Sequence, residues 1–353
     1  MMLRELELTN FRSYETARFA LHPDVTLVVG PNASGKTNLL EGLYVLASTR
    51  SFRAKDRDLV RHGEDYFRIV GRTEDTEYAL GYGDGEKKIT HDGVKRTLVG
   101  HVGQIQVTLF EPTDLELVAG APEGRRRYLD FLLSQTDRAY LRTLQQYRRV
   151  LKQRNALLDG FDVGRIRDQI FGWDVKLAEL AVEIYGARGR LLAVLAEATP
   201  LLYRDIAGES VEVAFEYLPS VTGVYEEQFL ETLARNLTRD LAAGFTTIGP
   251  HREDFKIHFK NNDITRVASR GETRTLVLAM KLAELGYAEE RTGIRPLLLL
   301  DDVFSELDRQ RRGYLLNRLE GYQTLVTTTD ADAITKEFRT AHQLIATEAA
   351  AHA

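Results

Sequence analysis

Apolar and polar residues alternate along most of the first 120 positions, a pattern typical of half-buried β-strands. The stretch LRELELTNF alternates from residue 3, and DVTLVVG, residues 24–30, is a short β-branched strand that runs into a glycine-rich turn. From Lys36 the run KTNLLEGLYVLAST changes to helical spacing. Residues 67–100 predict a series of short strands that are broken by Gly-Asp-Gly and Asp-Gly turns.

The pattern changes to long helices near Pro122. Residues 125–158 and 166–199 are helical runs, and residues 226–243 predict a third helix that is closed by Gly244. Strands are expected in ESVEVAFEYL, in FKIHF and in the apolar run PLLLLDD, residues 296–302. Neither long helical run keeps heptads long enough for an extended coiled coil.

Composition narrows the class of protein without naming a function. The 353 residues are 43% hydrophobic and 28% charged, with a formal net charge of −5 and no cysteine. Disulfides and thiolate metal sites are therefore excluded. The first residues lack a signal-peptide core, and no apolar run approaches the ~20 residues that span a bilayer. We expect a cytoplasmic protein with no membrane partner, in which any nucleic-acid surface depends on local charge.

One glycine-rich turn carries a phosphate-binding motif. Eight consecutive residues fit G-x-x-x-x-G-K-[ST], with an apolar strand before them and a helix after them. They are Gly30, Pro31, Asn32, Ala33, Ser34, Gly35, Lys36 and Thr37, and Asn38 follows them in the predicted site. Backbone N–H groups of such a loop wrap phosphates, its Lys reaches the β- and γ-phosphates and its Thr contacts Mg²⁺. The sequence therefore predicts an ATP and Mg²⁺ site.

The second half of this site is predicted at the end of the apolar strand PLLLLDD. Asp301 is expected to hold Mg²⁺ and Asp302 to polarise the attacking water, so Asp302 and Lys36 are the predicted catalytic residues. The two halves are 265 residues apart, too far for one compact nucleotide-binding fold. We therefore expect an α/β ATPase head of the ABC type, made from residues 1–122 and 245–353, with a mainly helical lobe of residues 123–244 inserted.

The ordered set of motifs resembles the RecF family of bacterial recombination-mediator ATPases over nearly the whole chain. LELTNFRSYE, GPNASGKTNLLE, LFEPTDLELVAGAPEGRRRYLD, GPHRED, SRGETRTLVLAMKLAE and LLLLDDVFSELD occur in the order of that family. The resemblance implies ATP-dependent homodimers and binding to single-stranded, gapped or junction DNA. It also implies work with RecO and RecR in loading the recombinase, in replication restart and in support of the SOS response.

The resemblance also implies residues that act between two copies of the chain. Ser269, Arg270, Gly271 and Glu272 match the ABC signature turn, although the family's usual Gln is Glu272 here. Ser305 and Asp308 match the loop that crosses the dimer interface. From the residues alone, a plain helix N-cap explains Ser269 better, and only the resemblance favours the signature role.

Other roles that the resemblance implies are less specific. The Gln that senses Mg²⁺ is either Gln104 or Gln106, with Gln104 preferred. The switch His has no counterpart, so Thr329 or Asp330 in VTTTD takes that place. Arg12 resembles a phosphate-contacting Arg of SMC-like heads, with a plain surface Arg as the alternative, and Arg252 in GPHRED is either functional or a turn residue.

A basic stripe is the predicted DNA surface. Residues 123–154 hold nine Lys or Arg against three acids. Of these we expect Arg148, Arg149 and Lys152 to contact the phosphate backbone without reading bases, although any single Arg is better explained as a residue of a solvated helix face. The predicted function is an ATP-gated DNA clamp with weak, DNA-stimulated ATPase activity that acts as a timer. A transporter ATPase, a chromosome-structural SMC protein and a P-loop kinase are the alternatives.

Overall fold

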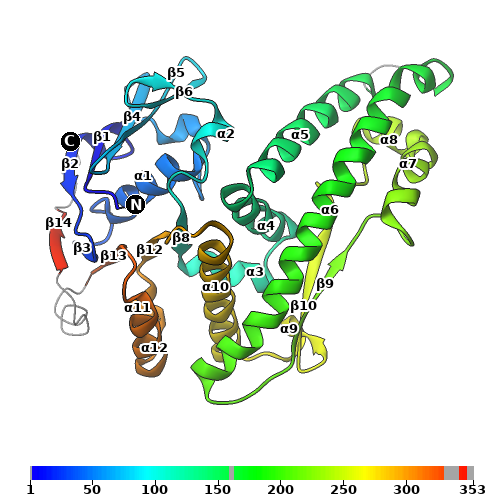
Figure 1. Ribbon diagram of the computed structural model, residues 1–353. Helices are drawn as coiled ribbons and strands as arrows, with labels where there is room; N and C mark the ends of the chain where they lie inside the picture. Colours follow the sequence, from blue (N-terminus) through cyan, green and yellow to red (C-terminus); the bar gives the residue numbers. More distant parts are fainter. Residues whose placement is uncertain (1, 159–162, 330–341, 348–353) are drawn as a thin grey trace. The chain divides into compact units, whose positions relative to one another are not determined.

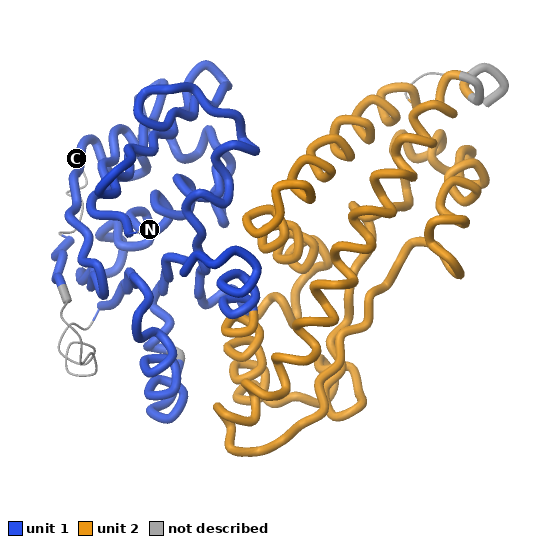
Figure 2. Tube along the Cα trace, viewed as in Figure 1, with its two compact units in different colours: residues 1–114, 284–353 blue, residues 115–283 orange. Residues whose placement is uncertain are grey.

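The computed structural model describes residues 2–158, 163–329 and 342–347 (Figure 1). The chain forms two compact units (Figure 2). The first, which we call the head, comprises residues 1–114 and 284–353, and the second, the lobe, comprises residues 115–283. None of the helices within the described ranges is long and apolar enough to cross a bilayer.

A five-stranded parallel sheet forms the centre of the head, in the order β14-β3-β13-β12-β8. Its strands are β3 Val25–Val29, β8 Val107–Phe110, β12 Leu297–Asp301, β13 Thr324–Thr328 and β14 His342–Ala346. They come from both ends of the sequence. Because all of them are parallel, the loops that follow β3, β12 and β13 emerge at the same edge of the sheet.

A six-stranded antiparallel sheet forms the second layer of the head, in the order β2-β1-β4-β5-β6-β7. Its strands are β1 Glu5–Phe11, β2 Tyr14–Ala20, β4 Tyr66–Arg72, β5 Glu77–Gly83, β6 Glu86–His91 and β7 Val94–Lys95. Helix α1, Lys36–Ser48, packs against strands of both sheets. This position explains why its sequence is apolar on nearly every side.

Short helices complete the head. They are α2 Leu98–His101, α11 Val303–Glu306 and α12 Arg309–Leu319, with 3₁₀ turns at Asp56–Leu59 and Pro112–Leu115. Helix α10, Arg270–Thr292, begins in the lobe and ends in the head. Since both ends of the chain build one parallel sheet and a mainly helical unit lies between them in sequence, the predicted α/β class is confirmed.

The lobe combines long helices with a small antiparallel sheet. Its helices are α3 Glu116–Ala119, α4 Pro122–Thr136, α5 Arg138–Leu158, α6 Val163–Ala207, α7 Tyr225–Arg235, α8 Leu237–Ala243 and α9 Ile264–Val267. The sheet is ordered β11-β10-β9, with β9 Val213–Leu218, β10 Asp254–Phe259 and β11 Asn262–Asp263. The first helical run is two helices, because the Asp137 carboxylate accepts from the N–H groups of Ala139 and Tyr140 and starts α5 anew.

The bounds of the lobe differ from the expected limits of 123 and 244. Strand β9 lies before Gly244 and β10 after it, yet the two pair along their length, from Val213–Phe259 to Leu218–Asp254. Arg125 of α4 also donates twice to the Asp254 carboxylate, at 2.8 and 2.7 Å. These contacts draw residues 245–283 into the same compact unit as the long helices.

Candidate nucleotide-binding site

The phosphate loop joins β3 to α1 in the head. Gly35 has a φ of 95°, and a Cβ there would lie 2.9 Å from the Tyr14 hydroxyl, so glycine is required. Ala33 also has a positive φ, 65°. The Lys36 ammonium donates to the carbonyls of Gly30 at 2.7 Å and Pro31 at 2.8 Å. The loop therefore has a closed shape in which its lysine points back to its own backbone.

Two carboxylates lie within electrostatic reach of Lys36. Burial lowers the pKa of Lys36, while the charges of Asp302 and Asp301 act in the opposite direction. These carboxylates end β12, and Lys36 begins α1. The head thus brings together the two motifs that the sequence predicted as halves of one site.

Asp301 is held by two threonine hydroxyls. Thr37 Oγ1 donates to Asp301 Oδ1 at 3.0 Å, and Thr327 Oγ1 donates to the same oxygen at 2.7 Å. The N–H of Asp302 donates back to Thr327 Oγ1 at 3.0 Å, and Asp302 has a φ of 51°. Thr327 therefore fixes the position of both acids, although the sequence analysis named Thr329 and Asp330 instead.

The donor atoms fit Mg²⁺ that is bound together with phosphate. Thr37 and Asp301 supply oxygen ligands of the kind that this ion takes from proteins, and Lys36 supplies a charge for phosphate. Among the described residues, no group of three or more His, Cys, Asp or Glu could hold a metal ion. A metal ion at this edge of the sheet would therefore need oxygens from the nucleotide to complete its ligands.

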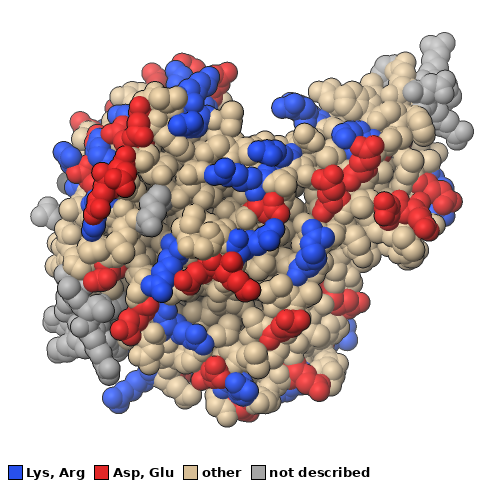
Figure 3. All heavy atoms as spheres, viewed as in Figure 1, with Lys and Arg blue, Asp and Glu red and all other residues tan. Residues whose placement is uncertain are grey.

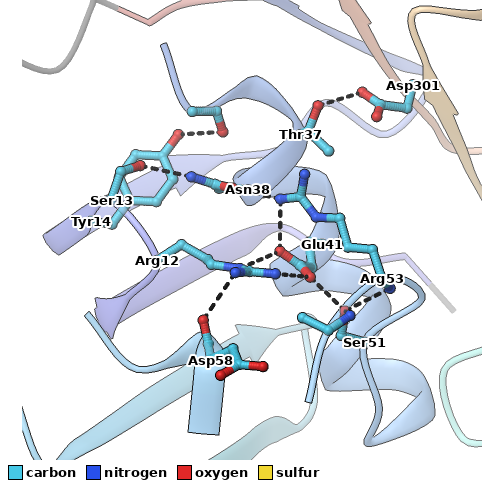
Figure 4. A network of polar contacts seen from close by, with 12 residues as sticks. Arg12, Ser13, Tyr14, Thr37, Asn38, Glu41, Ser51, Arg53, Asp58 and Asp301 are labelled. Carbon is cyan, nitrogen blue, oxygen red and sulfur yellow. Dashed lines mark hydrogen bonds and ion pairs between the residues drawn. The ribbon is translucent and has the colours of Figure 1, made fainter. Parts of the chain in front are cut away.

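A buried carboxylate organises the side of α1 that faces the antiparallel sheet (Figure 4). Glu41 accepts two hydrogen bonds from Arg12, at 2.8 and 2.9 Å, one from Arg53 at 2.8 Å and one from Ser51 at 2.5 Å. Burial opposes the ionisation of Glu41, but the hydrogen bonds from Arg12, Arg53 and Ser51 outweigh it and lower its pKa. Glu41 therefore stays charged inside the head.

Arg12 is engaged by this network on three nitrogens. Besides its two bonds to Glu41, Nη1 donates to the carbonyl of Asp58 at 2.9 Å. The expected phosphate contact of Arg12 stays a prediction, and it would have to use the remaining N–H groups. Sequence reasoning missed Glu41, whose signal was one acid in an otherwise apolar helix.

Side chains from neighbouring loops contact the phosphate loop and the start of α1 (Figure 4). The Tyr14 hydroxyl donates to the carbonyl of Gly35 at 3.1 Å, and Asn38 Nδ2 donates to Ser13 Oγ at 2.9 Å. Arg53 Nη2 donates to Asn38 Oδ1 at 2.6 Å. Asn38 thus connects the start of α1 to the turn that holds Ser13 and to the segment that holds Arg53. The exposed Asn32 makes none of these contacts within the described residues.

The expected signature turn lies in the lobe and forms a capping box. The Glu272 N–H donates to Ser269 Oγ at 3.3 Å, and the Ser269 N–H donates to Glu272 Oε2 at 2.8 Å. Lys260 Nζ lies 2.7 Å from Glu272 Oε1. The hydrogen bond from Lys260, which has the largest effect, and those from Ser269 lower the pKa of Glu272 to about 2. Ser269 and Arg270 are exposed, and Gly271 follows in the first turn of α10.

The residues of the expected interface loop are exposed in the head. Ser305 Oγ donates to the carbonyl of Asp302 at 2.7 Å, so this loop is tied directly to the second acid of the site. The Asp308 carboxylate caps α12 by accepting from the N–H of Arg311 at 2.9 Å. Their role between two copies stays a prediction.

The structure does not bring Gln104 or Gln106 to the site. Strands β8 and β12 are parallel with Val107 opposite Leu297, so both glutamines lie at the amino end of the sheet. Asp301 lies four residues further along β12, roughly 13 Å at the usual rise of a strand. Gln106 instead accepts from Thr292 at 3.2 Å. Thr329 is exposed just after β13, and Asp330 lies outside the described residues.

The basic stripe divides into internal and exposed residues. Arg125 pairs with Asp254, and Arg154 is fully buried against Asp174 and Asp240. Arg148 lies 3.3 Å from Asp130. Four other residues of α5 are exposed at intervals of four, seven and three positions, with no ion pair found for them in the described parts of the chain; they are Arg138, Arg142, Arg149 and Lys152.

These four residues lie on one face of α5 because their intervals follow the helical repeat. On the side of the molecule drawn in Figure 3, Lys and Arg side chains gather over α5. Of the three residues that were expected to contact DNA, Arg149 and Lys152 belong to this face, while Arg148 is paired. We call Arg138, Arg142, Arg149 and Lys152 the α5 face.

Known proteins resemble this chain over nearly its full length. It is 40% identical to the DNA replication and repair protein RecF of Moorella thermoacetica over 337 residues, which cover 94% of this chain and 90% of that protein. The chain belongs to the RecF family. The RecF proteins of Lactobacillus gasseri and Staphylococcus aureus are 37% and 35% identical, each with 96% of this chain and 95% of the relative covered. The family model for the RecF/RecN/SMC N terminal domain matches residues 2–71.

Solved structures agree with this assignment. The recombination mediator protein RecF–ATP of the RecFOR pathway is 37% identical with a TM-score of 0.85, and covers 93% of this chain and 92% of its own. RecF–ATPrS gives the same TM-score at 35% identity, with 97% and 95% covered. An SMC head bound to a winged-helix domain of ScpA, at 15% identity and a TM-score of 0.54, shares the fold alone. The ABC-type head predicted from the sequence is thereby confirmed.

Proposed function

We propose that this chain is an ATP-gated DNA clamp of DNA replication and repair. The observation that carries the proposal is the bond between Thr37 and Asp301, which joins the phosphate loop to an acid 264 positions away. Its RecF relatives are named for DNA replication and repair, and two solved neighbours of this family are described with ATP or ATPrS. A cytoplasmic location and the partners RecO and RecR are proposed on the same basis.

The head supplies the residues that would hold the nucleotide. Lys36 would neutralise phosphate charge, Thr37 and Asp301 would hold Mg²⁺, and the N–H groups of residues 31–38 would surround the phosphates. Bound Mg²⁺ and ATP supply a Lewis acid and a phosphoryl group with a good leaving group. Asp302 would polarise the attacking water; it follows Asp301 directly, and its charge reaches Lys36.

Hydrolysis would be slow, as suits a timer. Asp302 is one methylene shorter than the Glu usual in ABC ATPases, and VTTTD has no histidine to orient the water. The exposed Ser269 would complete the site of a second copy, so hydrolysis would require a dimer. The capping box supports this role because it holds Ser269 at the positive end of a 23-residue helix, where an anion is favoured.

The α5 face is the proposed DNA surface. Its four cations lack internal partners among the described residues, whereas Arg125, Arg148 and Arg154 have them. Unpaired, solvated cations on one helix face suit the phosphate backbone and release counterions when DNA binds. The face has no feature for reading bases, so binding would follow DNA shape and charge.

A gel shift on gapped duplex DNA with and without ATP tests this function. The clamp requires that ATP and Mg²⁺ strengthen the retention of DNA and that the Lys36→Met protein loses this gain. Retention of DNA that is the same with and without ATP, or no binding at all, would rule out the clamp. The latter result would favour a small-molecule kinase or a transporter ATPase.

A further inference from the structure

Strand β14 brings a distant residue to the phosphate loop. It lies beside β3 (Figure 1), parallel to it, with His342 opposite Val25 and Ala346 opposite Val29. Because Val29 is the last residue of β3, the residue after β14, Thr347, comes level with the start of the loop. The Thr347 N–H donates to the carbonyl of Val29 at 2.8 Å, which fixes this alignment.

The Thr347 side chain contacts Ser34 inside the loop. The oxygens Ser34 Oγ and Thr347 Oγ1 are 2.6 Å apart although the residues are 313 positions apart, and Ser34 is 6% exposed. Thr347 Oγ1 also lies 3.3 Å from the carbonyl of Val29. Since that carbonyl can only accept, both bonds are satisfied when Thr347 donates to Val29 and Ser34 donates to Thr347.

Thr347 also restricts position 30, the first residue of the loop, to glycine. A Cβ at Gly30 would lie 2.5 Å from the Thr347 carbonyl oxygen, closer still to its hydroxyl, and 2.6 Å from Ser34 Oγ. Such contacts are too short for any side chain. Thr347 therefore packs against the first residue of the motif and bonds to the fifth.

We propose that Thr347 is a positioning residue of the nucleotide site. Its hydroxyl holds Ser34 and thereby keeps the loop backbone in the shape that receives phosphates. A loop that is ordered before binding loses less conformational entropy when the ligand arrives, so its affinity is higher. This inference rests on the proposed function, because it requires that the loop binds ATP.

The test is calorimetric titration of Mg²⁺–ATP into the full chain and its variants. Thr347→Val removes the hydroxyl and keeps the shape, and should weaken binding roughly three- to tenfold, the usual worth of one hydrogen bond. Thr347→Ser keeps the hydroxyl and should bind like the parent. Ser34→Ala should match the loss of Thr347→Val, and the double variant should be no weaker than Ser34→Ala alone.

The matched control is Thr324→Val. Thr324 is a buried threonine of the parallel sheet that begins β13 at the amino end, opposite Val25, and donates to the carbonyl of Tyr322. Its substitution should leave ATP affinity unchanged. Melting of the nucleotide-free proteins checks that each variant folds, and Ser34→Ala carries the test if Thr347→Val does not fold.

Two results overturn the inference. The first is a Thr347→Val protein that binds ATP as tightly as the parent. The second is a Thr347→Val substitution that costs the same affinity in the Ser34→Ala background as alone, which would mean that Thr347 acts by packing and not through Ser34. Failure of the proposed function looks different, because the parent chain itself would then show no titration with Mg²⁺–ATP.

Discussion

Arg188 of the lobe and Lys36 of the head are both buried cations, but they have different kinds of partner. In the lobe, Arg188 is 2% exposed and donates to Asp130 at 2.8 Å and to the carbonyl of Pro250 at 2.7 Å. In the head, Lys36 is 8% exposed and donates to the carbonyls of Gly30 and Pro31.

The kind of partner distinguishes a buried cation that stabilises the fold from one that is available to bind a ligand. The Arg188 charge is neutralised inside the lobe by the Asp130 carboxylate, and losing that partner would leave a buried cation unpaired. Carbonyls are neutral, so phosphate oxygens can replace them at Lys36 with a gain in electrostatic energy. Burial alone therefore does not identify a functional residue; the kind of partner does.

The largest expected effect comes from breaking the lobe's internal pairing. Arg188→Met should lower the free energy of unfolding by about 3–5 kcal/mol, because Asp130 loses a buried partner. Arg190→Met, two residues later on α6 and exposed, should change it by less than about 0.5 kcal/mol. Urea denaturation measures both, and equal values for the two variants would contradict the structural role of Arg188.

Substitution of Asp302 in the head should lower ATP hydrolysis without affecting folding. Asp302→Asn removes the charge that would polarise water but keeps the shape, so ATP hydrolysis should fall roughly 10²-fold or more while ATP binding and stability persist. Phosphate release under single-turnover conditions measures the loss. Turnover at the parent rate would show that Asp302 is not the base.

The sequence predicts those parts of the site whose residues are neighbours along the chain. The phosphate loop and the two acids were predictable, because each is a contiguous motif with a strand beside it. Thr327, Glu41 and Thr347 were not, since their contacts cross between strands or loops whose register no single sequence reveals.

The same reason limited the prediction of the lobe and of the glutamines. Gly244 ends the predicted helical run with a φ of 72°, but that run is two helices, α7 and α8, and the sequence could not show that β9 and β10 pair across it. Gln104 was chosen from the resemblance to the family. Only the register of β8 against β12 shows that it lies at the wrong end of the sheet for Asp301.

An intermediate effect is expected at the α5 face. Changing Arg142, Arg149 and Lys152 to Gln should weaken binding to all DNA sequences and flatten the slope of log K against log [salt] by roughly two to three units. Arg148→Gln is the control, because Arg148 lies 3.3 Å from Asp130 and outside the α5 face, and its slope should change by less. An unchanged slope for the triple variant would place the DNA surface elsewhere.

The smallest effect is expected at the capping box. Lys260 neutralises Glu272, which would otherwise oppose an approaching phosphate. Lys260→Met should weaken ATP-dependent dimerisation roughly two- to fivefold, as for other exposed ion pairs, but should have no effect in the Glu272→Gln background. Sedimentation at several ATP concentrations measures this coupling, and the same loss in both backgrounds would refute it.

Ser269 is proposed to serve the ATP held by a second copy of the chain. Ser269→Arg would put a large cation in place of a hydroxyl at the exposed start of α10. Light scattering of this variant with saturating Mg²⁺–ATP tests the claim most directly. The account predicts that the variant binds ATP with parental affinity but keeps the mass of a monomer, while the parent doubles its mass. A Ser269→Arg protein that dimerises with ATP like the parent would contradict it and would leave Ser269 a helix cap that serves only its own chain.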